Sequence, residues 1–223
     1  MKIAIMGSGA VGVYFGGRLV QAGEDVTFIA RGRHLAAMRE AGLRIESRRG
    51  DVHLQPIRVV RDPASVGPVD VILFTVKRWS TEQAGRQLGP LIGRDTAVMS
   101  LQRGIDANSI LAALVGREHL MGAVCHIAAT VIRPGVVQQT GQTARLVFGE
   151  LGGDKTQRAE EFLEACARAK AGFDAELSGD IERAIGLSGA AVWPALEVGI
   201  ETRTSFDVEA SPRTFASDQR SRA

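Results

Sequence analysis

A glycine-rich turn near the N-terminus has the residue types and spacing that suit phosphate binding. It consists of Gly7, Ser8, Gly9, Ala10, Val11 and Gly12. In this pattern the first glycine permits a tight turn, the second lets the backbone approach a pyrophosphate, and the third lets a helix lie close to a sheet. The N-terminus of such a helix presents free N–H groups and a positive dipole to the phosphates. The turn therefore predicts a binding site for the pyrophosphate of a dinucleotide.

The elements on either side of the turn are the ones that such a site requires. Residues 2–6 are a short apolar run of strand formers, and Val11, Phe15 and Leu19 recur at helical spacing. A second strand is expected over residues 25–29. The alternative is a glycine-rich loop that only reverses the chain, but it does not account for a complete strand–turn–helix–strand unit.

A cationic side chain follows the second strand. A cofactor with a free ribose 2′-hydroxyl usually meets an Asp or Glu about 20 residues after the glycines. This chain has Arg31 there, with Arg33 and His34 close behind. A guanidinium can hold a 2′-phosphate through paired charge-assisted hydrogen bonds, whereas a carboxylate would repel it. The position favours NADPH over NADH and FAD, the alternative being that Arg31 is an ordinary solvated arginine.

A lysine ends the most apolar stretch of the chain. Residues 69–76 predict a central parallel strand buried on both faces, and Lys77 follows directly. Ligands of open α/β sheets bind outside the carboxyl ends of the strands, so this lysine is placed to meet a phosphate or carboxylate. An ordinary surface lysine is the alternative. The next strand, expected over 96–100, brings residues 101–104 to the same edge.

The other elements alternate helix with strand and then become consecutive strands. Helices are expected over 34–41, 80–88 with Ser80 as the N-cap, 108–114, 155–170 and after Asp180. A hairpin is expected over 43–46 and 53–57, ending near 59–60, followed later by strands over 120–123, 128–132, 136–140, 145–148 and 173–177. We therefore expect an α/β, Rossmann-like fold, with a mostly parallel, doubly wound sheet and an antiparallel meander on its edge.

The composition favours a soluble cytoplasmic protein. The 223 residues are 45% hydrophobic and 23% charged, with a net charge of +2. The two cysteines give neither a disulfide framework nor metal-ligand spacing, and we expect no signal peptide, membrane span or metal site. A group of arginines without interleaved aromatic residues predicts a solvated edge rather than a nucleic-acid surface: Arg44, Arg48, Arg49, Arg58 and Arg61.

Several short motifs have the same order and spacing as those of a known enzyme family. They are G-S-G-A-V-G at 7–12, I-A-R at 29–31, V-K at 76–77, S-L-Q-x-G at 100–104, and P-G-x-V-x-x-T-G at 134–141 ahead of F-G-E. Through them, residues 1–185 resemble the N-terminal domain of the ketopantoate reductase (2-dehydropantoate 2-reductase) family. The resemblance implies NADPH-dependent reduction of ketopantoate to pantoate, on the route to pantothenate and coenzyme A. It also implies a small 2-oxoacid as the substrate, and the sequence allows a homo-oligomer without specifying one.

The resemblance assigns cofactor-binding roles residue by residue. It implies that residues 7–12 bind the pyrophosphate and that Arg31 and Lys77 hold the adenosine phosphate or nearby polar groups. Gln102 and Arg103, in the S-L-Q-x-G loop, and Ala128 are implied to meet the cofactor as well. Arg103 is a departure, because the family has an asparagine there that touches cofactor and substrate.

A second departure concerns catalysis. After its D-I helix the family carries a tryptophan and, two residues later, the catalytic lysine, where this chain has Gly186, Leu187 and Ser188. No catalytic residue is therefore assigned. Residues 186–223 do not resemble the family's helical C-terminal domain, and those after 200 are rich in Arg, Ser and Thr. We expect an NADP-binding domain over 1–185 and a truncated or divergent, partly disordered tail over 186–223, for which a changed reading frame near Gly186 is our hypothesis.

Two alternatives to an active ketopantoate reductase stay open at this point. One is a catalytically inactive NADP-binding module, because the catalytic lysine is not matched. The other is a different NADP-dependent hydroxyacid dehydrogenase that shares the same dinucleotide-binding half.

Overall fold

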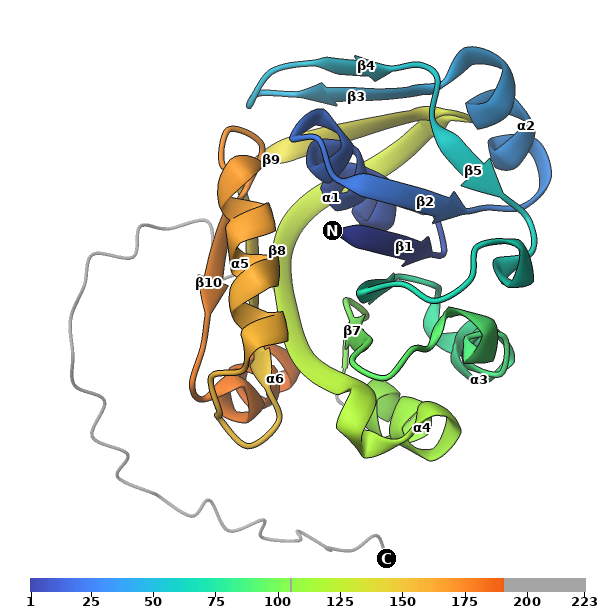
Figure 1. Ribbon diagram of the computed structural model, residues 1–223. Coiled ribbons are helices and arrows are strands. Elements are labelled where there is room, and N and C mark those ends of the chain that lie inside the picture. Colours follow the sequence, from blue (N-terminus) through green and yellow to red (C-terminus); the bar gives the residue numbers. More distant parts are fainter. Residues whose placement is uncertain (105, 191–223) are drawn as a thin grey trace, which may run out of the picture. The chain divides into compact units, whose positions relative to one another are not determined.

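The computed structural model describes residues 1–104 and 106–190, which belong to one unit (Figure 1). The strands are β1 (Lys2–Met6), β2 (Asp25–Ile29), β3 (Leu43–Ser47), β4 (Val52–Leu54), β5 (Arg58–Val60), β6 (Val71–Phe74), β7 (Ala97–Ser100), β8 (Leu120–Arg133), β9 (Val136–Glu150) and β10 (Asp174–Leu177). The α-helices are α1 (Ala10–Gln21), α2 (Gly32–Ala41), α3 (Thr81–Gly85), α4 (Asp106–Val115), α5 (Gln157–Arg168) and α6 (Ile181–Ala190).

One sheet contains all these strands. Its order is β4-β3-β9-β8-β7-β6-β1-β2-β5, and β10 pairs with β9 off this path. The run from β8 through β7, β6, β1 and β2 to β5 is parallel, and Ile5 of β1 pairs with both Phe28 and Leu73. The carboxyl ends of β1, β2 and β6 therefore meet at one edge of the sheet.

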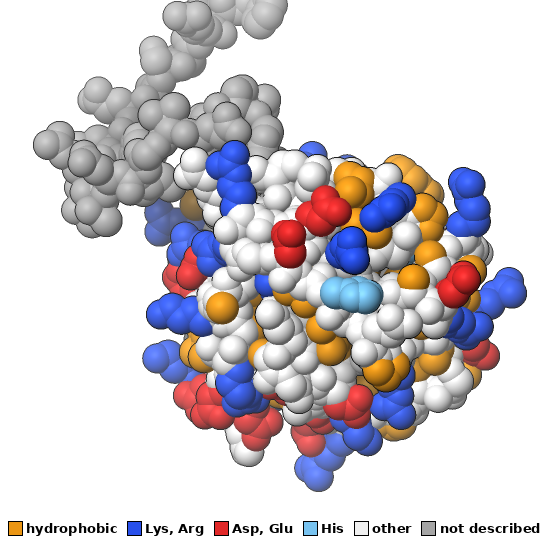
Figure 2. Space-filling model, turned by 90° about the horizontal axis from the view of Figure 1, so that it is seen from above, with side chains coloured by type: hydrophobic (Ala, Val, Ile, Leu, Met, Phe, Trp, Pro, Cys, Tyr) orange, Lys and Arg blue, Asp and Glu red, His pale blue; other side chains and the backbone are white. Residues whose placement is uncertain are grey.

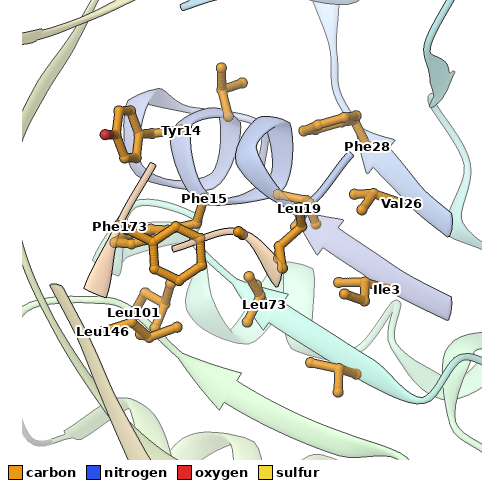
Figure 3. Packing of buried hydrophobic residues seen from close by; sticks show 14 of the residues in the cluster. Ile3, Tyr14, Phe15, Leu19, Val26, Phe28, Leu73, Leu101, Leu146 and Phe173 are labelled. Atoms are coloured by element: carbon orange, nitrogen blue, oxygen red, sulfur yellow. The ribbon is translucent and has the colours of Figure 1, made fainter. Parts of the chain in front are cut away.

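Alternate residues of the parallel strands pack into two separate cores. Ile3 and Ile5 face a core shared with Phe15 of α1 and Phe162 of α5, whereas Ala4 and Met6 face the other core, with residues of α3 and α4. Figure 3 shows Phe15 and Leu19 of α1 above the strands, with Phe173 against Phe15. Helices cover both faces of the sheet, which confirms the predicted doubly wound, mostly parallel α/β fold.

The predicted antiparallel meander is wrong in its strand count and its place. Two long strands, β8 and β9, take the place of four short ones, and β3 and β4 lie beyond them in the sheet. The glycine at 141 does not turn the chain. It lies opposite Ala128, where the pairing register shifts between Ile127 and Ala129. An irregularity of this kind absorbs extra residues without ending a strand.

Two other local predictions also need correction. Val59 and Val60 belong to a separate strand, β5, which pairs in parallel with β2 rather than extending the hairpin. Ser80 precedes α3, but its side chain makes no capping hydrogen bond, and the helix ends at Gly85. The neighbouring hydroxyl of Thr81 instead donates to the carbonyl of Arg78.

Two arginines of the predicted basic cluster pair with acidic side chains. Arg49 pairs with Asp174 at 2.6 Å, and Arg58 pairs with Asp25 at 3.1 Å. On the face shown in Figure 2, Lys and Arg side chains are interspersed with Asp and Glu.

The last described helix starts after Asp180, as the sequence predicted, and packs on β8. The Oδ1 atom of Asp180 accepts a hydrogen bond from the N–H of Arg183 at 3.4 Å, and Ile181 and Ile185 press against Gly122. The helix continues through residues 186–190, across the domain boundary that we expected after residue 185. The rest of the expected tail lies outside the described residues. In the described part of the chain, no helix is long and apolar enough to cross a bilayer.

A partly buried ion pair at the start of α5 gives a first testable prediction. Arg158 donates from Nε and Nη2 to the two carboxylate oxygens of Glu150, both at 2.7 Å, and Thr156 donates to the same group at 2.6 Å. Burial raises the pKa of Glu150, but these hydrogen bonds outweigh it and leave the pKa below its ordinary value of 4.5. The unfolded chain thus binds this proton more tightly, so the stabilisation is present above about pH 4.5 and lost as the pH falls below that value.

Glu150→Gln is expected to lower the free energy of unfolding by about 1.5–3 kcal/mol at pH 7, the usual range for hydrogen bonds to a charged group. The difference from the wild type should shrink as the pH falls below about 4.5. Urea unfolding at several pH values measures both effects. Glu176→Gln is the control, because Glu176 and Arg145 form an exposed pair that contributes about 1 kcal/mol or less. Equal losses in the two variants would contradict the prediction.

Candidate dinucleotide site

A cavity of about 670 Å³ lies at the carboxyl ends of β1, β2 and β6. Its floor is formed by residues 6–9, 29–31 and 75–77, which follow these three strands directly. Its other walls come from the start of α2, from Ser80, Gln83 and Ala84, and from residues 131–134 at the tip of the β8–β9 hairpin. This is the position at which open α/β sheets bind ligands.

The glycines of the turn have the conformations and surroundings that the sequence predicted. Gly7 has φ +96°, and a Cβ there would lie 2.8 Å from the backbone nitrogen of Val76. A Cβ on Gly12 would lie 2.7 Å from the Cγ2 atom of Ile5, so this glycine lets α1 pack closely on β1. A Cβ on Gly9 would meet nothing within 4 Å, because this position faces the open cavity. The three glycines thus have the three different surroundings expected in a phosphate-binding turn.

The same turn provides the N-cap of α1. Gly9 is the N-cap residue, and its carbonyl accepts the N–H of Val13 at 2.9 Å. The N–H groups of the first helical turn have no acceptor within the helix. The turn is itself held against β2, because the N–H and the hydroxyl of Ser8 both donate to the carbonyl of Ile29, at 3.2 and 3.0 Å. A phosphate in the cavity would therefore meet a preformed helix N-terminus.

Cationic side chains surround the rest of the cavity. Arg31, Arg33, Lys77 and Arg133 line it, and the described lining residues include no Asp or Glu. Arg31 and Lys77 are exposed, and Nη2 of Arg31 donates to the Oε1 atom of Gln87 at 3.0 Å. A cavity with this charge suits a ligand that carries several negative charges, such as a dinucleotide phosphate.

The structure brings together some of the predicted cofactor residues but not all of them. Gly7, Ser8, Gly9, Arg31 and Lys77 line the cavity, and Ala10, Val11 and Gly12 form the first turn of the helix that begins there. Gln102, Arg103 and Ala128 are not among the lining residues.

The amide side chain of Gln102 is engaged in a loop contact. Its Nε2 atom donates to the carbonyl of Val76 at 2.7 Å and to the hydroxyl of Thr81 at 3.0 Å. These bonds join the loop after β7 to the loop after β6. Contact of residues 102, 103 and 128 with the cofactor stays a prediction.

Sequence reasoning did not identify the far wall of the cavity. Val131, Ile132, Arg133 and Pro134 approach from the hairpin tip, and His34 lies between them and the glycine turn. The motif P-G-x-V was noted for the resemblance but gave no sign that the preceding residues face the glycine turn. A signal that could have drawn attention to them is the pair of large apolar residues, 131 and 132, directly before a turn.

Comparison with known families shows to which family this chain belongs. The family model for ketopantoate reductase PanE/ApbA matches residues 3–153, which include the glycine turn, Lys77 and the β8–β9 hairpin. The chain belongs to the ketopantoate reductase family. Membership accounts for the strand order and the glycine turn, and it implies a nicotinamide cofactor.

Individual relatives agree with this assignment. The 2-dehydropantoate 2-reductase of Pyrococcus horikoshii is 35% identical over 181 residues, covering 81% of this chain and 57% of that protein. The uncharacterized oxidoreductase YkpB of Bacillus subtilis is 32% identical over 185 residues, covering 83% of this chain and 60% of that protein. This chain thus spans roughly 60% of the length of these relatives.

Solved structures show the same fold. The 2-dehydropantoate 2-reductase of Geobacter metallireducens aligns with a TM-score of 0.77 at 33% identity, over 83% of this chain and 60% of that one. A D-mandelate dehydrogenase in complex with NADH and anilino(oxo)acetate aligns with a TM-score of 0.73 at 28% identity, over 83% of this chain and 59% of that one. The second of these neighbours shows that the same fold is compatible with NADH, so the phosphate preference of this chain must be argued from its own residues.

Proposed function

We propose that this chain binds NADPH and provides the cofactor-binding half of a reductase that converts ketopantoate to pantoate. The observation that carries the proposal is the cavity at the glycine turn, which combines a helix N-terminus with four cationic side chains and, among its described lining residues, no carboxylate. The cofactor would supply a hydride to the carbonyl carbon of a small 2-oxoacid. The residues of this chain would bind and orient that cofactor.

The division of labour within the cavity follows from the contacts described above. The glycine turn and the first turn of α1 are suited to the pyrophosphate, because Gly9 leaves room and the helix offers unpaired N–H groups. Arg31 lies just past the end of β2, which is Ile29, where a dinucleotide places its adenosine ribose. A guanidinium at this position favours a 2′-phosphate over a 2′-hydroxyl, and this supports NADPH over NADH.

Arg31→Ala tests the choice of cofactor. We expect the wild type to bind NADPH more tightly than NADH by about 1.5–3 kcal/mol, the usual contribution of charged hydrogen bonds. The variant should lose most of this difference, whereas its affinity for NADH should change little. Titration of both cofactors by calorimetry measures the preference directly.

Gln87→Ala is the matched control for this experiment. It removes the side-chain amide to which the Arg31 guanidinium donates but leaves the charge of Arg31 in the cavity. The preference for NADPH should therefore persist in the control. Equal affinities of the wild type for NADPH and NADH would refute the role of Arg31 in phosphate recognition.

A further inference from the structure

One imidazole ring connects the start of α2 to the tip of the β8–β9 hairpin. The Nδ1 atom of His34, in the first turn of α2, accepts a hydrogen bond from the N–H of Gly135 at 3.1 Å, across 101 residues of sequence. The carbonyl of Gly135 accepts from the N–H of Arg44 at 2.9 Å. Both backbone polar groups of the turn residue are thus bound to the segment that runs from α2 into β3.

The position of this turn determines one wall of the cavity. Gly135 has φ +78°, and a Cβ there would lie 3.4 Å from the Cβ atom of Ala37 on α2. The residues immediately before it, 131–134, line the cavity opposite the glycine turn. Val131 and Ile132 keep 40% and 46% of their surface exposed, and Val131 is paired with Val137 of β9. Besides this strand pairing and the bond from Arg44, the hydrogen bond to His34 is a contact that ties the turn to α2.

The bond also fixes the protonation state of the ring. Because a backbone N–H donates to Nδ1, that nitrogen must carry no proton, and the neutral ring must carry its proton on Nε2. Burial lowers the pKa of His34, although the backbone of Ser8 offsets part of this effect. The ring is thus held as a neutral hydrogen-bond acceptor near pH 7.

The second ring nitrogen has no comparable bond. Nε2 is buried and forms no hydrogen bond of ordinary geometry among the described residues, although the Ser8 backbone is near enough to raise the pKa of the ring. In the described structure the acceptor nitrogen Nδ1 is therefore the ring atom that makes a well-formed hydrogen bond.

We propose that His34 is a positioning residue for the cofactor, whose Nδ1 atom holds the hairpin tip in place as a wall of the dinucleotide cavity. This inference rests on the proposed function, because it assigns the cavity to NADPH. His34 acts through Gly135 and the side chains at 131–133. Loss of the acceptor frees the tip, and the cavity then binds the cofactor less tightly.

Two substitutions separate the acceptor from the rest of the ring. In His34→Asn the side-chain oxygen can take the place of Nδ1 and accept the N–H of Gly135, whereas His34→Leu keeps an apolar side chain without an acceptor. We expect His34→Leu to weaken NADPH binding about 10-fold, which corresponds to one lost hydrogen bond. His34→Asn should stay within about 3-fold of the wild type. Amide hydrogen exchange at Gly135 should accelerate in the leucine variant and remain slow in the asparagine variant.

The outcomes distinguish this inference from the proposed function. A wild-type chain that binds neither NADPH nor NADH would overturn the proposed function. Wild-type NADPH binding that is matched by His34→Leu, or an asparagine variant as weak as the leucine variant, would overturn the role of His34 alone. Thermal unfolding of all three proteins shows that each is folded at the temperature of the titration.

Discussion

Gly9→Val is expected to abolish measurable NADPH binding while the chain keeps its fold. Gly9 has φ −79° and ψ −170°, a conformation that any residue adopts, and a Cβ there meets no atom within 4 Å. A branched side chain instead occupies the space in front of the α1 N-terminus. Loss of two or more charge-assisted hydrogen bonds to a phosphate corresponds to a decrease in affinity of about 10²–10⁴-fold.

The matched control is Gly12→Ala, one helical turn further on. A Cβ there would lie 2.7 Å from Ile5, so the helix must shift away from β1, and overpacking of this kind destabilises a protein by about 1–3 kcal/mol. Calorimetric titration with NADPH and thermal unfolding should therefore rank the variants in opposite orders. Normal NADPH binding by Gly9→Val would show that the phosphates lie elsewhere.

The N-terminal unit could be predicted from the sequence because its determinants are local. The apolar run at 2–6, the glycines and the helical spacing of Phe15 and Leu19 all lie within 20 residues of one another. The conformation of Gly7 and the close contact of Gly12 with Ile5 are the features that those glycines predicted. The same reasoning placed Lys77 at the edge of the sheet, since the buried strand β6 ends at Phe74, shortly before it.

Features that depend on distant pairing could not be predicted in the same way. Gly141 indicated a turn, but β9 continues through it because the register with β8 shifts opposite Ala128. β3 pairs with β9, more than 90 residues away, and this pairing places the β8–β9 hairpin inside the sheet. His34 likewise faces a hairpin tip 101 residues further along the chain. No local pattern of residue types specifies such pairings.

The polypeptide of residues 1–223 is expected to bind NADPH and yet to reduce ketopantoate negligibly. Hydride transfer to a ketone places negative charge on the carbonyl oxygen, which must be stabilised and protonated as it forms. The family resemblance places a lysine for this purpose where the chain has Ser188, in α6. A hydroxyl carries no charge and is a far weaker acid. Loss of a general acid alone typically lowers the rate by about 10²–10⁴-fold.

Other lysines of the chain do not compensate for this difference. Of Lys2, Lys77, Lys155 and Lys170, only Lys77 lines the described cavity, where it is suited to a phosphate.

Oxidation of NADPH in the presence of ketopantoate measures turnover, with the relative from Geobacter metallireducens as the reference. Ser188→Lys alone should not restore activity, because the segment spans only about 60% of that relative and positioning of the substrate also requires its remaining part. A chimera in which the remaining part of the relative follows residue 185 of this chain should gain activity. Turnover by residues 1–223 at the rate of the relative would contradict this account of Ser188.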